Sequence, residues 1–314
     1  MARLIDAVIG HRTIWQKLLH QFQVQQLPHA LAFAGPSGIG KRRVAWAFAQ
    51  GLVCEREPAM APCGECSSCR RVENKQSESV LFVEPQKGTI KLESTQQVLQ
   101  FLNLRRLGKA RVVIIDGAQS MNPQAANALL KAIEEPPEQT YFILLVSEWS
   151  QLLPTLRSRL QRLRFSPLSE TEMKTQEELP AWMLRSARGS FEQLESFRDS
   201  EVDELRQLTL LYLLSAVEGR RQGLDGLMDR TKDREVAARA LQFLQQLLRD
   251  WSLLETDDTI HTDLRPKLEA LRRPELMQRV TLWRKAFQME QDLHAHVDRA
   301  LIFENFFYQA QAAK

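Results

Sequence analysis

The sequence predicts an α/β domain built on a mostly parallel sheet, followed by segments that are helical throughout. Four short apolar runs are typical of buried strands, and they lie at residues 30–35, 79–85, 111–116 and 141–147. Amphipathic stretches such as 93–107 and 122–135 separate these runs, and strands that alternate with helices favour βαβ units. After about residue 166 the strand-like runs disappear, so we place a domain boundary there.

Composition and length are those of a globular protein with more than one domain. The chain has 314 residues, of which 44% are hydrophobic and 26% are charged. Its formal net charge of +3 is too small to make the whole chain a nucleic-acid binder. No apolar run approaches the roughly 18 residues that a membrane helix needs, and the N-terminus does not resemble a secretory signal. We therefore expect a cytosolic protein with reduced thiols.

Two kinds of local signal define the helices. Asn122-Pro123 begins the 122–135 helix, and Pro136-Pro137 ends it. In the second half of the chain, apolar residues recur at helical spacing, which predicts the core of a helix bundle rather than a cofactor site. These residues are Leu241, Leu244, Leu248 and Trp251, and then Ala300, Phe303, Phe307 and Ala310.

The stretch "GPSGIGKR" (35–42) predicts a phosphate-binding loop. Gly35, Gly38 and Gly40 allow backbone amides to curl around phosphates at a helix N-terminus, and Lys41 would reach the outer phosphates. The apolar run before the loop and the helical pattern after it are the context that this motif requires. A glycine loop of no particular function is the alternative.

Two further positions predict that this site does not hydrolyse ATP. Magnesium is normally held by a loop Ser or Thr and by an acid at the end of a neighbouring strand. Asp116 is that acid, but Arg42 takes the place of the hydroxyl residue, and a guanidinium cannot ligate magnesium. We expect Arg42 to pair with Asp116 instead. Gly117 stands where many such ATPases have a glutamate that polarises the attacking water. The residues leave open whether the loop still binds ATP or ADP.

All four cysteines lie within one short segment, "CEREPAMAPCGECSSC". Cys54, Cys63, Cys66 and Cys69 include two CxxC steps, whose tight turns aim neighbouring thiolates at one point. Disulfides and a redox CxxC are the alternatives, but nothing indicates export, and redox chemistry does not need four thiols. We predict a structural zinc ion with a closed shell of four thiolates.

The order of these motifs resembles the AAA+ clamp-loader subunits of bacterial DNA polymerase III. The resemblance is carried by the loop, the four cysteines, "VVIIDGAQSMNPQAANALLKAIEEPP" and "LRSRL", and it covers residues 1–165. It implies an AAA+ P-loop domain with a zinc module at 1–165, a small helical lid at 166–203 and a helical collar for oligomerisation at 204–314. The lid is short for the family's three helices.

Within this family some members hydrolyse ATP and others carry a decayed ATP site, and this sequence resembles the second kind. Arg42 and Gly117 depart from the hydrolysing pattern. A third departure is Glu192, which aligns with the position of a phosphate-contacting arginine in "SARGSFEQLESF".

This sequence contains a segment that resembles one functional motif of the family. In "LRSRLQRLRF", Ser158 and Arg159 match the family's Ser-Arg-Cys motif, with Leu160 in place of cysteine. The resemblance implies that Arg159 reaches across a subunit interface as a catalytic arginine finger for a neighbour's ATP. The alternative is a solvated basic strand edge, made by Arg157, Arg159, Arg162 and Arg164.

The resemblance also implies partners. These are gamma/tau and delta subunits in a hetero-pentamer, with the sliding clamp and primer-template DNA engaged through the complex of the polymerase holoenzyme. The alternatives are an ATP-hydrolysing gamma/tau-like subunit and a non-replicative adaptor that uses an AAA+ core and zinc for protein binding. His294 and His296 lack partner acids at metal spacing and are expected on the surface, and the scattered His11, His20 and His29 predict no hydrolase triad.

Overall fold

The computed structural model describes residues 2–174, 179–271 and 275–312. The chain forms two compact units. The first comprises Met1–Thr175 with Arg188–Glu192, and the second comprises Gln176–Ala187 with Gln193–Lys314. The division into three domains at 165 and 203 stays a prediction.

The first unit contains a five-stranded parallel sheet in the order β2-β3-β4-β1-β5. Its strands are β1 (Ala30–Ala34), β2 (Val80–Val83), β3 (Arg111–Ile115), β4 (Thr140–Val146) and β5 (Gln161–Arg164). The four strands predicted from apolar runs are confirmed. The fifth comes from the basic segment and pairs with β1 at one edge of the sheet, with Leu31 opposite Gln161. Sequence reasoning considered this strand only as an alternative, because its outward residues are arginines.

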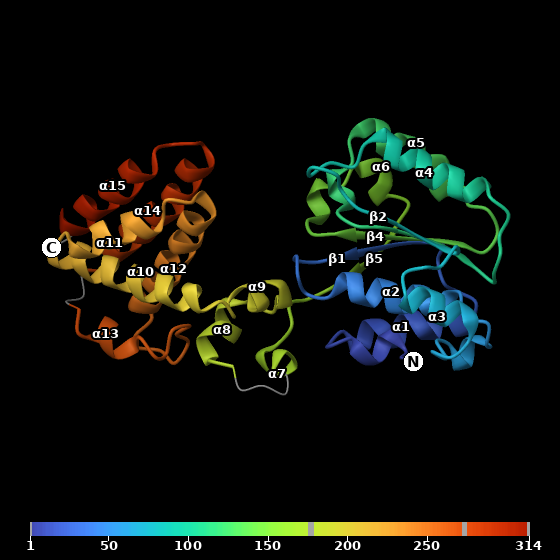
Figure 1. Ribbon diagram of the computed structural model, residues 1–314, viewed down its shortest axis with the longest axis horizontal. Coiled ribbons are helices and arrows are strands. Elements are labelled where there is room, and N and C mark those ends of the chain that lie inside the picture. Colours follow the sequence, from blue (N-terminus) through green and yellow to red (C-terminus); the bar gives the residue numbers. More distant parts are fainter. Residues whose placement is uncertain (1, 175–178, 272–274, 313–314) are drawn as a thin grey trace. The chain divides into compact units, whose positions relative to one another are not determined.

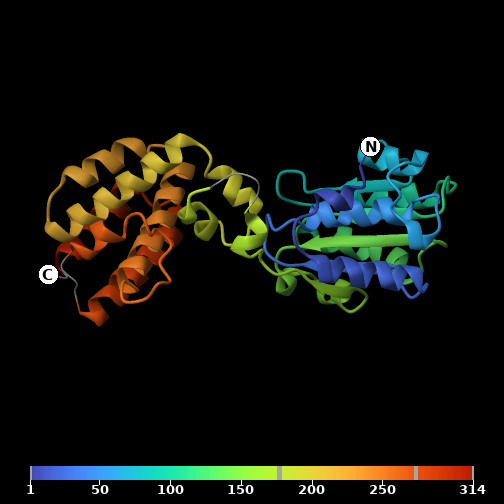
Figure 2. The same cartoon turned by 90° about the horizontal axis from the view of Figure 1, so that it is seen from below.

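Helices cover both faces of this sheet (Figures 1 and 2). One face carries α4 (Leu92–Asn103), α5 (Pro123–Glu134) and the short α6 (Pro154–Arg157). The other carries α1 (Arg12–Gln23), α2 (Lys41–Leu52) and α3 (Ser67–Glu73). The unit also contains α7 (Glu170–Met173).

Successive residues of each strand contribute to two separate cores, as a sheet with two buried faces requires. On β4, Phe142 and Leu144 pack beneath α4 and α5, whereas Ile143 and Leu145 pack toward α1 and α2. Because both faces are buried, the strands consist of continuous apolar runs. This is why the sequence identifies them without alternation.

The helix predicted over 93–107 ends earlier, at Asn103. Leu104 caps it in an extended conformation, with φ −68° and ψ 156°. The buried Arg111 side chain, at the start of β3, donates to the backbone carbonyls of Leu102 and Leu104. These bonds satisfy the carbonyls that another helical turn would have used. In contrast, α5 begins and ends as predicted, and the Asn122 side chain accepts the amide of Ala125 at 2.8 Å.

The described part of the second unit contains helices and loops and no strand. The helices beyond α7 are α8 (Ala181–Ser186), α9 (Phe191–Ser196), α10 (Ser200–Glu218), α11 (Gln222–Arg230), α12 (Arg234–Ser252), α13 (Arg265–Glu269), α14 (Leu276–His294) and α15 (Arg299–Ala312). The predicted apolar stripe on α12 is buried in full. Of the stripe predicted on α15, Phe303, Phe307 and Ala310 are buried, whereas Ala300 near its start is only partly buried. The described part of 166–203 thus holds three short helices and the first turn of α10, and the first of these helices belongs to the sheet unit.

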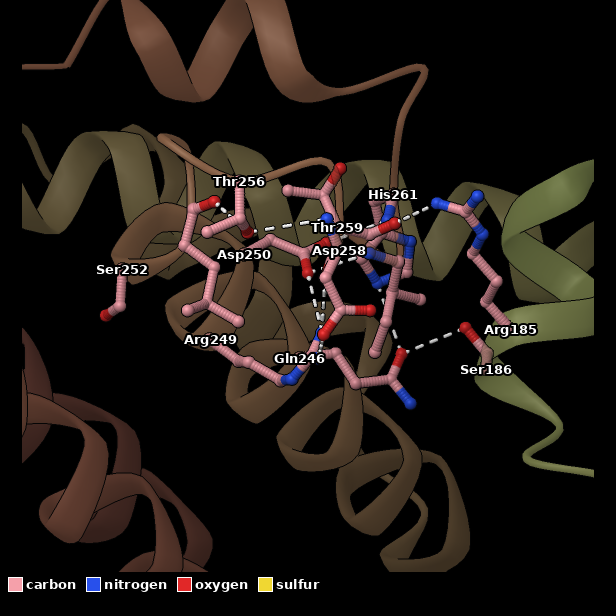
Figure 3. Close-up of polar contacts among 12 residues, drawn as sticks. Arg185, Ser186, Gln246, Arg249, Asp250, Ser252, Thr256, Asp258, Thr259 and His261 are labelled. Carbon is pink, nitrogen blue, oxygen red and sulfur yellow. Dashed lines mark hydrogen bonds and ion pairs between the residues drawn. The ribbon is translucent and has the colours of Figure 1, made fainter.

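A buried polar network fixes the segment after α12 (Figure 3). The Asp250 carboxylate accepts the backbone amides of Ile260 and His261 at 2.8 and 2.7 Å. The Gln246 side-chain oxygen accepts from Ser186 Oγ at 3.0 Å and pairs with His261 Nε2 at 3.1 Å. These side chains replace the secondary structure that this loop lacks, because buried backbone amides need partners.

Among the described residues, none of the helices combines the length and apolarity that crossing a membrane would take.

Candidate functional site

The predicted phosphate-binding loop connects β1 to α2 at the carboxyl edge of the sheet. Gly38 and Gly40 have φ of +74° and +100°, a conformation that residues with a Cβ atom rarely adopt. At Gly35 a Cβ atom would lie 2.2 Å from the carbonyl oxygen of Phe165. All three glycines are therefore required by the path of the loop.

Lys41 is the first residue of α2 and its side chain folds back over the loop. Its Nζ donates to the carbonyl oxygens of Gly35 and Pro36 at 2.6 and 2.5 Å. Burial lowers the pKa of Lys41 to about 8, against the opposing charges of Asp116 and Glu192. The ammonium group thus lies at the N-terminus of a helix, where phosphate groups bind in such loops.

Arg42 points to the end of β3 and forms the ion pair predicted from the sequence. Its guanidinium nitrogens lie 2.7 and 2.5 Å from Asp116 Oδ2. A second carboxylate, Glu84, lies 3.3 Å away, and the guanidinium lies over the ring of Phe82, 5.0 Å from its centroid. Asp116, the acid that the sequence predicts as a magnesium ligand, therefore pairs with a side-chain cation of its own chain.

Gly117 follows Asp116 in a conformation that does not suit glutamate. Its φ is +60°, and a Cβ atom would lie 2.9 Å from Cγ of Pro85. Its amide donates to Asp116 Oδ1 at 2.9 Å, which helps to hold the carboxylate toward Arg42. A glutamate here would need a different turn after β3.

Glu192 lies against the glycine loop. Its carboxylate accepts from Ser37 Oγ at 3.3 Å, and the amide of Phe191 donates to the Gly38 carbonyl at 2.9 Å. A carboxylate at this position opposes the binding of a phosphate, because the two charges have the same sign.

Three residues at this site were not recognised in the sequence. His11 Nε2 bonds to the carbonyl oxygen of Ile39 at 2.7 Å and so anchors the loop from the side. Glu84 and Ser147 follow β2 and β4, and Ser147 Oγ accepts from Gln119 at 2.6 Å. The signal for both was their position directly after a buried strand, since carboxyl ends of parallel strands meet at one edge.

Arg159 lies apart from this site, just before β5 and therefore at the amino edge of the sheet. Its guanidinium pairs with Glu134 at the end of α5, and Nη1 donates to the Thr155 carbonyl at 2.8 Å. The side chain is 34% exposed. Arg162 differs, since its guanidinium stacks over Trp149 at 4.8 Å from the ring centroid.

The four cysteines converge at the end of α2 and the start of α3. Their Sγ atoms all lie within 4.8 Å of one another, and those of Cys63 and Cys69 are 3.9 Å apart. A tetrahedral shell with Zn–S bonds of about 2.3 Å requires Sγ atoms about 3.8 Å apart, so a small contraction would complete it. The donors are four soft sulfur atoms with no nitrogen or oxygen ligand among them, a set that fits zinc. The described cluster could hold this metal.

Backbone amides support the cysteine cluster. Those of Glu65 and Cys66 both lie 3.4 Å from Cys63 Sγ, and that of Cys69 lies 3.4 Å from Cys66 Sγ. Burial raises the pKa of Cys63, but these amide bonds outweigh it and lower the pKa to about 6. Such bonds are the outer support that orients metal ligands.

The chain is similar to replication proteins of bacteria. The family described as DNA polymerase III, delta subunit, matches residues 10–169. The delta' subunit of Pseudomonas aeruginosa is 36% identical over 159 residues, which are 50% of this chain and 48% of that protein. The tau/gamma subunit of Haemophilus influenzae is 30% identical over 209 residues, 62% of this chain and 30% of that protein. The delta' subunit of Escherichia coli is 33% identical over 51% of this chain and 48% of that protein.

A solved structure shows the same fold. A gamma subunit-related protein of DNA polymerase III from Thermotoga maritima aligns with 94% of this chain and 99% of its own, with a TM-score of 0.55 and 18% identity. The chain belongs to the family of clamp-loader subunits of bacterial DNA polymerase III. The chain spans less than half of the length of the delta' and tau/gamma subunits named above.

Proposed function

We propose that this chain is the delta-prime subunit of the clamp loader, a ring member that does not hydrolyse ATP. The observation that carries the proposal is the Arg42–Asp116–Glu84 ion-pair cluster, which would keep Asp116 from ligating a catalytic magnesium ion. The conformation of Gly117 and the carboxylate of Glu192 support it, because hydrolysis needs a water-polarising glutamate and a cationic phosphate contact. The loop keeps its shape through three glycines and a lysine, which are Gly35, Gly38, Gly40 and Lys41. The proposed role does not require the loop to bind ATP or ADP.

Zinc would act as a structural cofactor in this account. Cys54, Cys63, Cys66 and Cys69 would close the shell, so the metal would have no open position for chemistry. Its role would be to hold the segment between α2 and α3 against the sheet.

Arg159 would serve a neighbouring subunit. It is a solvent-accessible guanidinium on the sheet edge opposite to the chain's own loop, so it has no role in its own site. Its planar fork can bond two phosphate oxygens at once. In the ring, gamma/tau would lie on one side of this chain and delta on the other. The assembly would open the sliding clamp and place it on primed DNA.

Reconstitution tests the proposal. Mixed with gamma/tau and delta subunits of the same bacterium, the full chain should form a hetero-pentamer that contains one copy of it, as measured by native mass spectrometry. If the pentamer forms without this chain, or with several copies in place of gamma/tau, the assignment is wrong. The first result would favour the non-replicative adaptor, and the second would favour a gamma/tau-like subunit.

A further inference from the structure

The ligands of the predicted zinc site come from the ends of two helices and the loop between them. Cys54 directly follows α2, whereas Cys66 caps α3 and Cys69 lies in its first turn. The amides that bond to the sulfur of Cys63 come from within the segment 63–69. Such local bonds cannot bring Cys54 toward the other three cysteines, so contacts between the two helices have to close the cluster.

Both a buried and an exposed contact join the end of α2 to the start of α3. In the buried contact, the Gln50 side chain on α2 donates to the backbone carbonyl of Cys69 at 3.1 Å. The exposed contact is made by Glu55, whose Oε1 accepts three hydrogen bonds. The donors are Ser67 Oγ at 2.6 Å, the amide of Ser68 at 3.1 Å and Ser68 Oγ at 2.9 Å.

Glu55 lies beside three of the four ligands. It follows Cys54 in the chain, and its two serine partners lie between Cys66 and Cys69. A single carboxylate therefore ties the first ligand to the last two. Ligands that are held together before the ion arrives lose less conformational freedom when it binds, and this raises the affinity for the metal.

The Glu55 carboxylate is oriented toward α3 and not into the cluster. The described ligand atoms that lie within 4.8 Å of one another are the four Sγ atoms, without an oxygen of Glu55 among them. Arg71 donates to Ser67 Oγ at 3.2 Å, which leaves the proton of that hydroxyl directed at the carboxylate. Glu55 thus acts on the site through the residues that it holds.

We propose that Glu55 is a positioning residue of the zinc site, which holds the first turn of α3 against the end of α2. The role rests on the zinc site of the proposed function. Its geometric effect opposes the effect of its charge, because four thiolates outnumber the two charges of the ion and a nearby carboxylate disfavours the resulting negative shell. Loss of Glu55 therefore weakens metal binding only if its hydrogen bonds outweigh its charge.

Three variants of the full chain separate hydrogen bonding from charge. Glu55→Ala removes both, whereas Glu55→Gln removes the charge and keeps an oxygen that accepts from the serines. Glu57→Ala is the control, because Glu57 is an exposed acid of the same segment whose side chain makes no capping bond. Ser68→Ala would still leave the bonds from Ser67 Oγ and the amide of residue 68, so that chain should keep a filled site.

Metal affinity is measured with cobalt(II), whose absorption bands report sulfur ligation, and with zinc by competition against a chelator. Glu55→Ala should bind both metals about 10–100-fold more weakly than wild type. Glu55→Gln and Glu57→Ala should bind them as tightly as wild type. At saturation all of these proteins should give the same cobalt spectrum, because the same four sulfur atoms ligate the ion. The metal-free variants should keep the wild-type thermal midpoint, because exposed side chains contribute little to stability.

Several results would overturn the role of Glu55. It is wrong if Glu55→Ala binds metal as tightly as wild type, or if Glu55→Gln binds as weakly as Glu55→Ala. An equal loss in Glu57→Ala would assign the effect to the charge of the segment. A lower thermal midpoint of metal-free Glu55→Ala would make Glu55 a general structural residue, and an altered cobalt spectrum at saturation would make it a ligand.

In each of these cases the wild-type chain still binds metal, and the zinc site of the proposed function stands. A wild-type chain that binds neither cobalt nor zinc would instead reject the zinc site and the role of Glu55 together. Assembly with gamma/tau and delta is measured separately by reconstitution, so neither result decides it.

Discussion

At the scale of single residues, Arg42 changes the chemistry of the loop without changing its shape. A guanidinium that is 55% exposed is held by two carboxylates and an aromatic ring, and all of these follow or belong to neighbouring strands. Removing Arg42 alone would leave Asp116 without its partner but would not supply the missing hydroxyl or glutamate. The site is therefore altered at several positions that support one another.

Arg159→Ala should lower ATP turnover of the reconstituted complex while assembly stays intact. In the free chain Arg159 pairs with the 44% exposed Glu134, and exposed pairs of this kind contribute about 0–1 kcal/mol, so the arginine can leave at little cost. An arginine finger contributes about 10³–10⁵ in rate at its site. The total loss would be partial, because only one interface depends on this chain, and Arg159→Lys should rescue little.

The control for this prediction is Arg164→Ala, an exposed arginine of β5. It is better matched than Arg162, which stacks on Trp149. Clamp- and DNA-stimulated hydrolysis is the measurement. Equal behaviour of the Arg159 and Arg164 variants would show that Arg159 belongs only to a basic strand edge.

His261 should make the second unit less stable in acid. Burial lowers its pKa from 6.5 to about 3, and the charge of Arg206 acts in the same direction. The unfolded chain therefore binds a proton below pH 6.5 that the folded chain does not bind until about pH 3. The free energy of unfolding should fall as pH falls through this window, by at most about 1.4 kcal/mol per pH unit.

Chemical denaturation between pH 7.5 and 5 would measure this effect, with His261→Gln as the comparison. Glutamine does not titrate, so the variant should show a smaller slope with pH than wild type. Identical slopes would mean that His261 takes up its proton in the folded state as well.

At the scale of elements, the parts with local signals were predictable and the parts that depend on distant contacts were not. The four apolar strands, the Asn122 cap and the Arg42–Asp116 pair follow from short motifs. The early end of α4 depends on Arg111, which is separated from the helix in sequence. No pattern within residues 93–107 could reveal it.

The same reasoning applies to the site. The glycine loop and Asp116 were predicted because each belongs to a motif. Glu84 and Phe82 contact Arg42 only because β2 lies beside β3, and that pairing is a matter of register between strands. His11 was not predicted because it reaches the loop from a different element.

The cysteine module should depend on metal as one folded element. If zinc closes the shell, the purified chain contains one zinc per molecule, and Cys66→Ser loses it. The segment 54–75 should then exchange its amide hydrogens faster, because zinc binding free energy is also local folding energy. Ser68→Ala is the control, since Ser68 bonds to Glu55 in the same segment without lying in the shell. Metal analysis and hydrogen exchange measure the outcome, and metal-free protein with an intact segment would contradict it.

At the scale of the whole molecule, the chain combines a unit built on a five-stranded parallel sheet with a second, helical unit. Three features would make it a stationary member of an ATP-driven ring: the Arg42–Asp116 ion pair, the glycine loop without a hydroxyl residue, and the accessible Arg159. Such a member would contribute surfaces and one arginine, and its neighbours would contribute the hydrolysis.

The central claim is that this chain does not turn over ATP at its own loop. The most direct test is steady-state ATP hydrolysis by the purified chain, with Lys41→Ala as the matched control. Hydrolysis at a loop of this kind requires the lysine that contacts the phosphates, so the variant shows the background rate. The missing hydroxyl and glutamate each remove transition-state stabilisation worth orders of magnitude in rate. We predict that wild type and Lys41→Ala give the same background rate with magnesium and ATP in excess. A rate above background that disappears in Lys41→Ala would contradict the account and show that the loop is a working ATPase site.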